Sequence, residues 1–394
     1  MKIIFHTHEF NLKSGGPCTK RILSFVDMLT EKGHEVTILT GSHNKKSNSK
    51  SISNKYKIIY SYTMALGKKK NLYRFIEQMS FAVSSFFVGI VKLKKADFLL
   101  TTSPPPFSSI TGYFLGKIKK AQVIYDVRDI WPDVALEMGS FNEKSIYFKI
   151  FKFISNFMYK HADYITTVTP RKTKKLQKRC NKKSKVWYVA NGFDDNFLNF
   201  KVDRGLVKKY GLKDKFNVVY TGNIGLAQNL DALLNLAKEN LYNKNIQFLI
   251  FGDGAYKTQL QKRIEDERLE NVFVYEKIEY SKIYTVMKYA NISFVSLKNN
   301  KMLDSVPTKM FDALGVGCPV LLLAKGDSAD ILSETSLGEN ATNYEELVQK
   351  FNYIKNNYEE YTAKSKTAIK YVIDNYSRKK IAVEFERLLS EHVK

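Results

Sequence analysis

The chain has 394 residues, 44% of them hydrophobic and 26% charged, which is the composition of a globular protein of about two domains and excludes a disordered chain. Its three cysteines, at 18, 180 and 318, lack the spacing of metal ligands, and so sparse a count indicates a reducing compartment. The net charge of +24 implies an anionic partner, and most of it lies in residues 1–200, which hold 34 Lys and Arg against 14 Asp and Glu.

Strand-like and helix-like segments alternate through the first half of the chain. The pair Gly15-Gly16 follows the first strand, at the carboxyl end where open parallel sheets bind ligands. Two glycines before a helix let a phosphate or sugar approach the backbone, although they can equally form a plain turn. The G-x-G-x-x-G fingerprint is absent, which disfavours a nicotinamide cofactor. We predict strands at 2–6, 36–39, 98–102, 123–127, 164–168 and 187–190, and helices at 19–32, 72–93, 107–117, 145–160 and within 171–185.

Two of these helices, 72–93 and 145–160, are rich in aromatic residues and carry lysines at their ends or between the aromatic positions. Such a helix is either buried in the core or lies in a membrane interface. The longest apolar run, 81–91, is too short to span a bilayer. The chain starts with a strand-like segment and not with a cleavable signal peptide, so we expect a cytoplasmic protein.

The second half of the chain repeats the alternation after Asn191-Gly-Phe-Asp194, which marks the exit from the first domain. Two successive arrays of this kind predict an α/β protein with two Rossmann-like domains facing each other across a central cleft. We place the N-terminal domain at 1–195 and the C-terminal domain at 196–375. The expected strands are 216–221, 248–251, 272–275, 292–297 and 320–323, and the tail from 344 is mostly helical.

The stretch 304–320 combines two carboxylates, Asp304 and Asp312, with Lys309 between them. Pro307 can start a helix here because its missing N–H would have no partner in the first turn anyway. A helix start presents backbone N–H groups and the positive end of the dipole, so it can hold a phosphate, to which Lys309 would add a charge. Asp312 could accept hydrogen bonds from sugar hydroxyls. An ordinary helix-to-strand turn with surface charges explains the same pattern.

Polar and aromatic residues follow the strand at 123–127, in the sequence Arg128-Asp-Ile-Trp-Pro-Asp133. The carboxyl end of a strand is where α/β enzymes keep their sites. Trp131 either contacts a ligand or packs onto the sheet. His8 is a further candidate because it follows the first strand.

These motifs occur together in the order of a known family. They cover nearly the whole chain, and they resemble the bacterial surface-polysaccharide branch of family 4 glycosyltransferases, especially the enzymes similar to L-fucosamine transferases of O-antigen assembly. The stretch around Asp312 resembles the family's E-x7-E region, with Asp at both acidic positions. The matching motifs are Gly15-Gly16, Ser103-Pro-Pro-Pro106, Arg128-Asp-Ile-Trp-Pro-Asp133, Thr169-Pro170, Asn191-Gly192, Tyr220-Thr-Gly-Asn-Ile-Gly225, Gly252-Asp-Gly254 and Pro307-Thr-Lys309.

The resemblance implies a GT-B fold and a retaining transfer of a sugar to a lipid-linked glycan in capsule or O-antigen biosynthesis. The expected donor is a nucleoside diphosphate sugar, namely a UDP-linked N-acetylated deoxyhexosamine held by the C-terminal domain. The N-terminal domain would bind the acceptor, and a last helix at about 376–394 would pack back on it. Cationic side chains and a helix start would stabilise the leaving diphosphate, so no metal and no other cofactor is expected.

The resemblance also assigns the site residues. Asn223 and Gln228 stand where many relatives have Arg and Lys, so charge neutralisation should depend more on Lys309 and on the N–H groups that follow Gly222. Arg128 stands where many relatives have His, and Asp129 beside it is a candidate general base or merely orients Arg128. The implied catalytic residues are Arg128, Asp129 and Asp304, the donor contacts are Gly15, Gly16, Asn223, Gln228, Gly252, Gly254, Lys309 and Asp312, and the acceptor contacts are His8 and Trp131.

Three interpretations of the basic first half stay open. A polyprenyl diphosphate acceptor on an anionic membrane surface accounts for both the charge and the aromatic helices, and it implies peripheral attachment to the inner face of the cell membrane. A nucleic-acid-binding protein would use the same charge on phosphates and stack its aromatic residues on bases. A GT-B nucleotide-sugar epimerase would share the fold without transferring a sugar.

Overall fold

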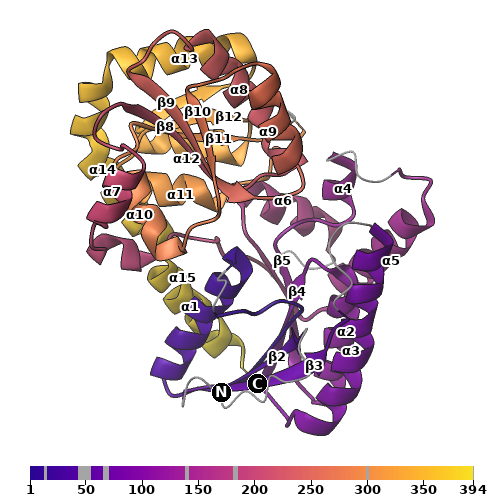
Figure 1. The fold of residues 1–394 in the computed structure, drawn as a ribbon. Helices are drawn as coiled ribbons and strands as arrows, with labels where there is room; N and C mark the ends of the chain where they lie inside the picture. Colours follow the sequence, from indigo (N-terminus) through magenta and orange to yellow (C-terminus); the bar gives the residue numbers. More distant parts are fainter. Residues whose placement is uncertain are drawn as a thin grey trace. The chain divides into compact units, whose positions relative to one another are not determined.

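The chain folds into two α/β units (Figure 1). Unit 1 comprises Met1–Asn191 and Lys379–Lys394, and unit 2 comprises Gly192–Arg378. The sequence predicted the boundary at residue 195 and the return to the first domain at about residue 376. The structure, a computed structural model, describes residues 1–12, 16–42, 55–64, 71–137, 142–180, 185–298 and 301–393.

Unit 1 is built on a parallel sheet of seven strands in the order β3-β2-β1-β4-β5-β6-β7. Ile3 and Phe5 face one layer of helices and Ile4 faces the other, as the two-residue period of a strand requires when both faces are covered. One strand, at 57–62, was not predicted from the sequence. The strands are β1 (Lys2–Thr7), β2 (Glu35–Ser42), β3 (Lys57–Tyr62), β4 (Phe98–Ser103), β5 (Gln122–Val127), β6 (Tyr164–Thr167) and β7 (Val186–Tyr188).

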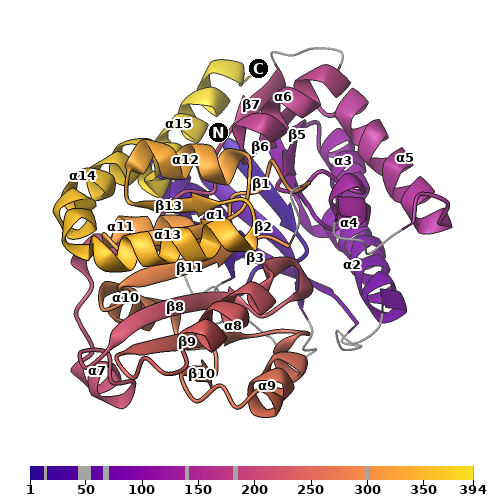
Figure 2. The same cartoon turned by 90° about the horizontal axis from the view of Figure 1, so that it is seen from above.

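Helices cover both faces of this sheet (Figure 2). The first helix and the C-terminal helix share one hydrophobic cluster with the strands, and α2 and α3 share another on the opposite face. The predicted aromatic helices at 72–93 and 145–160 are present within about two residues of their expected ends. The helices of unit 1 are α1 (Pro17–Glu31), α2 (Asn71–Lys92), α3 (Pro106–Ile118), α4 (Asp133–Glu137), α5 (Ile146–His161), α6 (Pro170–Arg179) and α15 (Arg378–His392).

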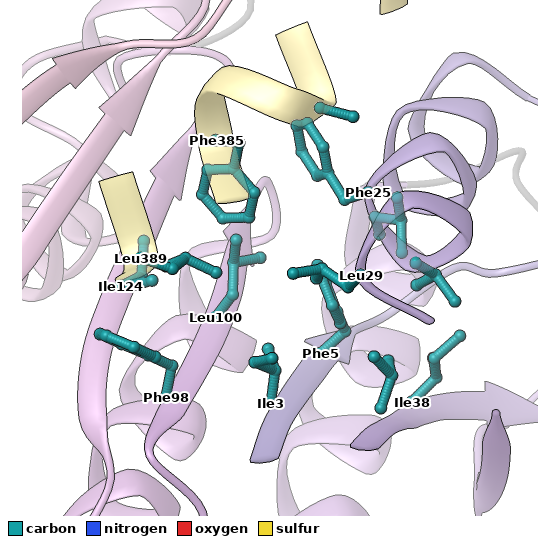
Figure 3. Close-up of a cluster of buried hydrophobic side chains, with 14 of the residues drawn as sticks. Ile3, Phe5, Phe25, Leu29, Ile38, Phe98, Leu100, Ile124, Phe385 and Leu389 are labelled. Carbon is teal, nitrogen blue, oxygen red and sulfur yellow. The ribbon is translucent and has the colours of Figure 1, made fainter. Parts of the chain in front are cut away.

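The C-terminal helix α15 completes the hydrophobic core of unit 1. Figure 3 shows Phe385 and Leu389 of α15 beside Phe25 and Leu29 of α1. The rings of Phe25 and Phe385 are 4.5 Å apart, and none of the four side chains is more than 2% exposed. Such burial contributes roughly 1.5–3 kcal/mol per side chain, so α15 is an integral part of the unit.

A buried carboxylate also connects α15 to the rest of unit 1 by hydrogen bonds. Glu386 accepts hydrogen bonds from Lys32 at 2.8 Å and from Ser390 at 2.8 Å, and it lies 3.1 Å from His34. Its side chain is 8% exposed. The hydrogen bond from Lys32 is the main cause that lowers the pKa of Glu386 to about 2, against the opposing effect of burial, with smaller contributions from Ser390 and His34.

Replacing Glu386 with Gln is expected to lower the free energy of unfolding by about 2 kcal/mol at pH 7, because charge-assisted hydrogen bonds are lost in a buried site. The folded pKa lies below the ordinary value of 4.5, so this stabilisation is present above about pH 4.5 and disappears as the pH falls toward 2. Urea denaturation at several pH values measures it. The control Glu384→Gln removes an exposed pairing with Arg387, 54% exposed at Glu384, and should change little. Equal effects of both substitutions would contradict the account.

Unit 2 is built on a second parallel sheet, in the order β10-β9-β8-β11-β12-β13. The order reverses between β8 and β11, and this switch point is where open α/β sheets bind ligands. The edge strand β13, at 338–341, was not predicted. The strands are β8 (Phe216–Asn223), β9 (Ile246–Asp253), β10 (Val272–Tyr275), β11 (Ile292–Ser296), β12 (Val320–Leu323) and β13 (Gly338–Ala341).

The helices of unit 2 alternate with its strands, as a Rossmann-like array requires. Their order in the chain explains why each strand ends in a loop at the same edge of the sheet. The helices are α7 (Arg204–Lys209), α8 (Leu230–Glu239), α9 (Lys257–Asp266), α10 (Tyr280–Lys288), α11 (Thr308–Gly315), α12 (Asp327–Thr335), α13 (Tyr344–Asn356) and α14 (Tyr358–Tyr376), with short 3-10 turns at Asp195–Asn199 and Leu226–Gln228.

Helix α2 is apolar on more than one face. Phe81 and Ala82 are buried against unit 1, whereas Phe87 and Val91 are 63% and 81% exposed. In the described part of the chain, α2 contains one window, Phe75–Lys92, that is long and apolar enough to cross a membrane by length and composition alone. The helix also packs along α3 and β3 as a layer of unit 1.

Candidate functional site

Two glycine-containing turns touch at the carboxyl ends of β8 and β9 in unit 2. Gly222 pairs with Gly252 across the two strands, and a Cβ at Gly252 would lie 1.9 Å from the carbonyl oxygen of Gly222. Gly254 has φ +159°, and a Cβ there would lie 2.3 Å from the carbonyl oxygen of Ile224. Glycine is therefore required at Gly252 and Gly254 for the two turns to approach each other.

Backbone hydrogen bonds hold the two turns together. The N–H of Ile224 donates to the carbonyl oxygen of Asp253 at 2.9 Å, and the N–H of Tyr256 donates to that of Ile224 at 3.0 Å. The prediction that the N–H groups following Gly222 hold phosphate is wrong for Ile224, because its N–H is already satisfied within the paired turns. Positive charge for an anion at this turn then has to come from a side chain.

Asn223 and Gln228 lie together at the rim of the first turn. The Nδ2 of Asn223 donates to the Oε1 of Gln228 at 3.5 Å, and Asn223 is exposed. A Cβ at Gly225 would lie 2.5 Å from the former atom and 2.9 Å from the latter. The two amides thus offer neutral donors and acceptors to a ligand, but no charge.

Lys309 reaches the same turn from the start of α11. Its Nζ lies 3.6 Å from the centroid of the Tyr220 ring, and a Cβ at Gly222 would lie 3.3 Å from it. In the described part of the chain this buried Nζ has no hydrogen-bond partner. Burial lowers the pKa of Lys309 to about 7, and the charge of Asp312 partly opposes that shift. A buried amine without a partner beside a glycine turn is suited to bind an anion.

Asp312 lies one turn along α11 from Lys309 and is 6% exposed. The hydroxyl of Tyr280 in α10 donates to its Oδ1 at 2.8 Å. Burial and then the charge of Asp312 raise the pKa of Tyr280 well above its ordinary value, so the phenol stays a hydrogen-bond donor. Tyr280 was not among the predicted site residues. The contact of Asp312 with ribose hydroxyls stays a prediction.

Asp304 is buried in the loop that precedes α11, with 5% exposure. This loop is fastened to the start of α12, since the N–H of Asp327 donates to the carbonyl oxygen of Leu303 at 2.8 Å. The expected helix start at Pro307 is confirmed within one residue, because Pro307 is the N-cap of α11. The role of Asp304 in the site stays a prediction.

A cavity of about 470 Å³ lies elsewhere in unit 2, between the starts of α8 and α13 and the ends of β11 and β12. None of the predicted donor residues lines it. Its lining residues are Asn229, Asp231, Ala232, Asn235, Leu297, Lys298, Leu323, Thr342, Asn343 and Tyr344.

A cavity of about 210 Å³ lies in unit 1 at the carboxyl ends of β1, β4 and β5. It brings together two predicted residues, His8 and Arg128. The Nη2 of Arg128 donates to the carbonyl oxygen of Pro104 at 3.1 Å, and its buried Nε has no hydrogen-bond partner in the described ranges. Burial lowers the pKa of Arg128, but the charges of Cys18, Asp126, Asp129 and Glu9 raise it overall. The other lining residues are Thr7, Glu9, Cys18, Gln78, Pro104 and Pro105.

Asp129 forms an ion pair with Lys172 of α6. The Nζ of Lys172 lies 3.3 Å from the Oδ1 of Asp129, and the two side chains are 4% and 41% exposed. A buried ammonium therefore holds an exposed carboxylate next to Arg128. The role of Asp129, as a general base or as a group that orients Arg128, stays a prediction. Lys172 was missed because it stands among many lysines in α6, and nothing local marks it as special.

Trp131 packs against α5 and not onto the sheet. Its ring meets that of Phe151 edge-on at 5.5 Å, within an apolar cluster of α2, α3 and α5. It does not line the cavity with His8 and Arg128. Its acceptor contact therefore stays a prediction that this cavity does not support.

The glycine pair before α1 is only partly described. Gly16 is the N-cap of α1, and a Cβ there would meet no atom within 4 Å, so the space beside it is open. Gly15 lies outside the described residues.

Comparison with known proteins finds a family match in the second half of the chain. Residues 204–389 match the family model described as "Glycosyl transferases group 1". The match covers slightly less than half of the chain. The group 1 segment contains both glycine turns, Lys309 and Asp312, whereas the cavity around Arg128 lies outside it.

Two curated proteins are similar to the chain. "Probable glycosyltransferase WbjE" of Pseudomonas aeruginosa is 20% identical over 262 residues, 64% of this chain and 65% of that protein. "Putative colanic acid biosynthesis glycosyl transferase WcaI" of Escherichia coli K12 is 24% identical over 263 residues, 64% of each chain. The chain thus matches slightly less than two thirds of the length of these relatives.

Comparison with solved structures shows the fold of nearly the whole chain. Sucrose-phosphate synthase from Thermosynechococcus elongatus superposes with a TM-score of 0.81 at 14% identity, covering 99% of this chain and 98% of that one. Anabaena HepE in complex with UDP gives 0.73 at 13% identity, covering 99% and 100%. The fold is the expected GT-B type, with two Rossmann-like units.

Proposed function

We propose that the protein is a glycosyltransferase that moves a sugar from a nucleoside diphosphate sugar to a glycan acceptor. One observation carries this proposal: the buried amine of Lys309, without a hydrogen-bond partner in the described ranges, lies against the glycine turn at Gly222. Transfer places negative charge on the leaving diphosphate, and a preorganised cation in a water-poor site stabilises that charge strongly. Lys309 thereby supplies the positive charge that other transferases draw from a metal ion.

Two observations support a UDP-linked donor and sugar transfer, and the retaining course of the transfer is part of the proposal. The HepE structure contains UDP, and its fold is shared by this chain. The names of WbjE and WcaI favour transfer over the nucleic-acid-binding and epimerase alternatives. In our proposal the donor sugar is an N-acetylated deoxyhexosamine, Asp312 accepts from the ribose hydroxyls, and Asp304 lies by the reacting centre. Asn223 and Gln228 contact the diphosphate through their amides.

The acceptor in this proposal is a polyprenyl diphosphate glycan of capsule or O-antigen biosynthesis. The 210 Å³ cavity of unit 1 offers it the guanidinium of Arg128 and the imidazole of His8. Asp129 is the acceptor-side carboxylate, held in place by Lys172. A carboxylate 41% exposed beside a cavity is accessible to a sugar hydroxyl, which is the group that must lose a proton during transfer.

A thermal-shift screen tests the donor assignment. UDP, GDP, ADP and their sugars are added one at a time to the full chain in EDTA. UDP or a UDP-sugar is expected to raise the melting temperature, because a ligand that binds only the folded state stabilises it by mass action. If none of these nucleotides raises the melting temperature, the proposed function is wrong.

The surface of unit 1 supports attachment to an anionic membrane. Helix α3 packs against both α2 and α5, and several exposed side chains of these three helices are large and apolar. We call this the apolar surface of unit 1. Large exposed apolar patches mark interaction sites, whereas single exposed apolar residues do not. Its members are Val83, Phe87, Ile90 and Val91 of α2, Phe114 and Ile118 of α3, and Ile146, Tyr147 and Phe153 of α5, which are 38% to 81% exposed.

Exposed lysines stand on or directly after the same three helices. Each Lys near an anionic membrane contributes about 1 kcal/mol, and exposed Phe, Ile and Val enter the interface between headgroups and acyl chains. The combination favours an anionic lipid surface over a nucleic acid, because a nucleic acid would offer no apolar partner to the exposed aliphatic side chains of this surface. The lysines are Lys92, Lys94 and Lys95 at the end of α2, Lys117 and Lys120 at the end of α3, and Lys149, Lys152 and Lys160 on α5.

The protein is expected to co-sediment with vesicles that contain phosphatidylglycerol and to be released by salt. Raising NaCl from about 0.1 M to about 1 M shortens the Debye length from about 10 Å to about 3 Å, which screens the lysines. The double change Phe87→Ser and Val91→Ser should weaken binding about tenfold or more through lost apolar burial. Tyr242→Ser, a 91% exposed position of unit 2, is the control. Equal binding to neutral phosphatidylcholine vesicles at high salt would remove the electrostatic argument.

A further inference from the structure

Tyr220 touches both halves of the proposed phosphate site. It lies on β8, two residues before Gly222, and its side chain is fully buried. The face of its ring lies 3.6 Å from the Nζ of Lys309. Its hydroxyl donates to the carbonyl oxygen of Asn223 at 2.6 Å. One side chain therefore contacts the amine and also braces the glycine turn.

The ring contact matters because Lys309 has no hydrogen-bond acceptor in the described residues. An ammonium group that has lost water is costly to bury, and an aromatic face is one of the few apolar surfaces that attracts it. The attraction is strongest when the cation is desolvated. Tyr220 thereby holds the amine in place and favours its protonated form while the site holds no anion.

The hydroxyl contact has a separate effect. The carbonyl oxygen of Asn223 belongs to the turn whose next N–H, that of Ile224, is tied to Asp253. Burial raises the pKa of Tyr220, so its phenol remains protonated and keeps donating. The turn is thus pinned from two directions, and its backbone stays at a fixed distance from Lys309.

We propose that Tyr220 is a positioning residue of the donor site, whose ring face holds the Lys309 amine ready for the diphosphate while its hydroxyl fixes the turn from Gly222 to Gly225. When the diphosphate binds, the amine exchanges the ring for phosphate oxygens, which are stronger partners. The inference rests on the proposed function for the identity of the anion. The contact between Tyr220 and Lys309 is independent of that identity.

A double-mutant cycle in the nucleotide-free protein tests the contact by itself. Tyr220→Leu and Lys309→Met are made singly and together, and unfolding by urea is measured at pH 6 and pH 10. At pH 6 the loss of the ring should cost more stability with Lys309 present than with Met in its place, because the amine is then charged. At pH 10 the difference should shrink, because the amine is then neutral. Tyr210→Leu, a buried tyrosine of the same unit, should combine additively with Lys309→Met.

UDP binding tests the positioning role. Tyr220→Leu is expected to weaken UDP binding about tenfold at pH 7.5 and to move the pH at which affinity falls to a lower value, whereas Tyr220→Phe keeps the ring and should hold that pH unchanged. If Tyr220→Leu does not fold, Tyr220→Met replaces it. The inference is overturned if the effects of Tyr220→Leu and Lys309→Met on stability are additive at pH 6. It is also overturned if UDP affinity depends on pH in the same way in Tyr220→Leu and Tyr220→Phe, even when both bind UDP. Coupling at pH 6 without binding of any nucleotide supports the contact, but overturns its role in donor binding together with the proposed function.

Discussion

Lys309→Met is expected to abolish stabilisation by UDP, with affinity falling about 100-fold or more. The amine is buried, has no hydrogen-bond partner in the described ranges and points at the turn of Gly222, so a bound diphosphate would lose a charge-assisted contact in a water-poor site. Isothermal titration with UDP in EDTA measures the loss. Lys288→Met, an exposed lysine of α10, is the control and should bind UDP normally. Normal binding by Lys309→Met would remove Lys309 from the site.

The same substitution, Lys309→Met, should stabilise the nucleotide-free protein. The pKa of Lys309 is lowered to about 7 from 10.5, so burying its charge costs stability. This cost is fully present below about pH 7 and is relieved as the pH rises toward 10.5, where the unfolded chain also loses the proton. Lys309→Met should therefore be more stable than the natural protein at pH 6, by a margin that shrinks toward pH 10. A gain in protein stability on substitution is typical of a residue that is kept for function.

UDP binding should also take up protons. A diphosphate raises the pKa of the amine back toward its ordinary value, so at pH 8 most molecules gain a proton when they bind. The titration heat should then depend on the ionisation enthalpy of the buffer, and the affinity should fall as the pH rises above 7. In Lys309→Met the titration heat should not depend on the buffer through residue 309, and the affinity should not fall above pH 7 because of this residue.

Asp129→Asn is expected to lose transfer by about 10²–10⁴-fold while UDP binding stays normal, because a carboxylate that takes a proton in the transition state contributes in that range. Asp129 lies in unit 1 and Lys309 in unit 2, so the two functions are carried by different parts of the chain. Asn keeps an oxygen for Lys172, which limits any loss of stability. The readout is release of UDP from a UDP-sugar in the presence of a lipid-linked acceptor.

The matched control for this change is Asp163→Asn. Asp163 also pairs with a lysine of unit 1, Lys117, at 3.0 Å, but it does not line the cavity. Its substitution should leave transfer unchanged. If Asp129→Asn transfers normally, or if it loses UDP binding as well, the assignment of Asp129 to the acceptor side is wrong.

The sequence predicted those parts of the site that depend on local order. Glycines and charged residues after apolar strands point to the same edge of a parallel sheet, whereas the family resemblance assigned Gly252, Gly254 and Lys309 to one donor site. The start of α11 at Pro307 followed from the chemistry of proline. The alternation of strands and helices sufficed for the fold. The strand at 57–62 was not predicted although it contains Ile58 and Ile59, and the four-residue strand at 338–341 carries too little apolar pattern to be recognised.

Contacts between distant side chains could not be predicted in this way. The ring of Tyr220 under Lys309, the pairing of Lys172 with Asp129 and the contacts of Glu386 join residues far apart in the chain. Each of these residues has many equivalents in composition, so nothing local distinguishes it. The backbone role assigned to Ile224 was wrong for a related reason, since its partner lies on the next strand.

Hydrogen–deuterium exchange with and without UDP tests the central claim most directly, because it locates the nucleotide without any substitution. The account predicts that UDP slows exchange in peptides that cover 220–228, 252–256 and 304–312, which hold the glycine turns and the start of α11. Protection confined to unit 1, or to the 470 Å³ cavity around 229–235 and 342–344, would contradict it.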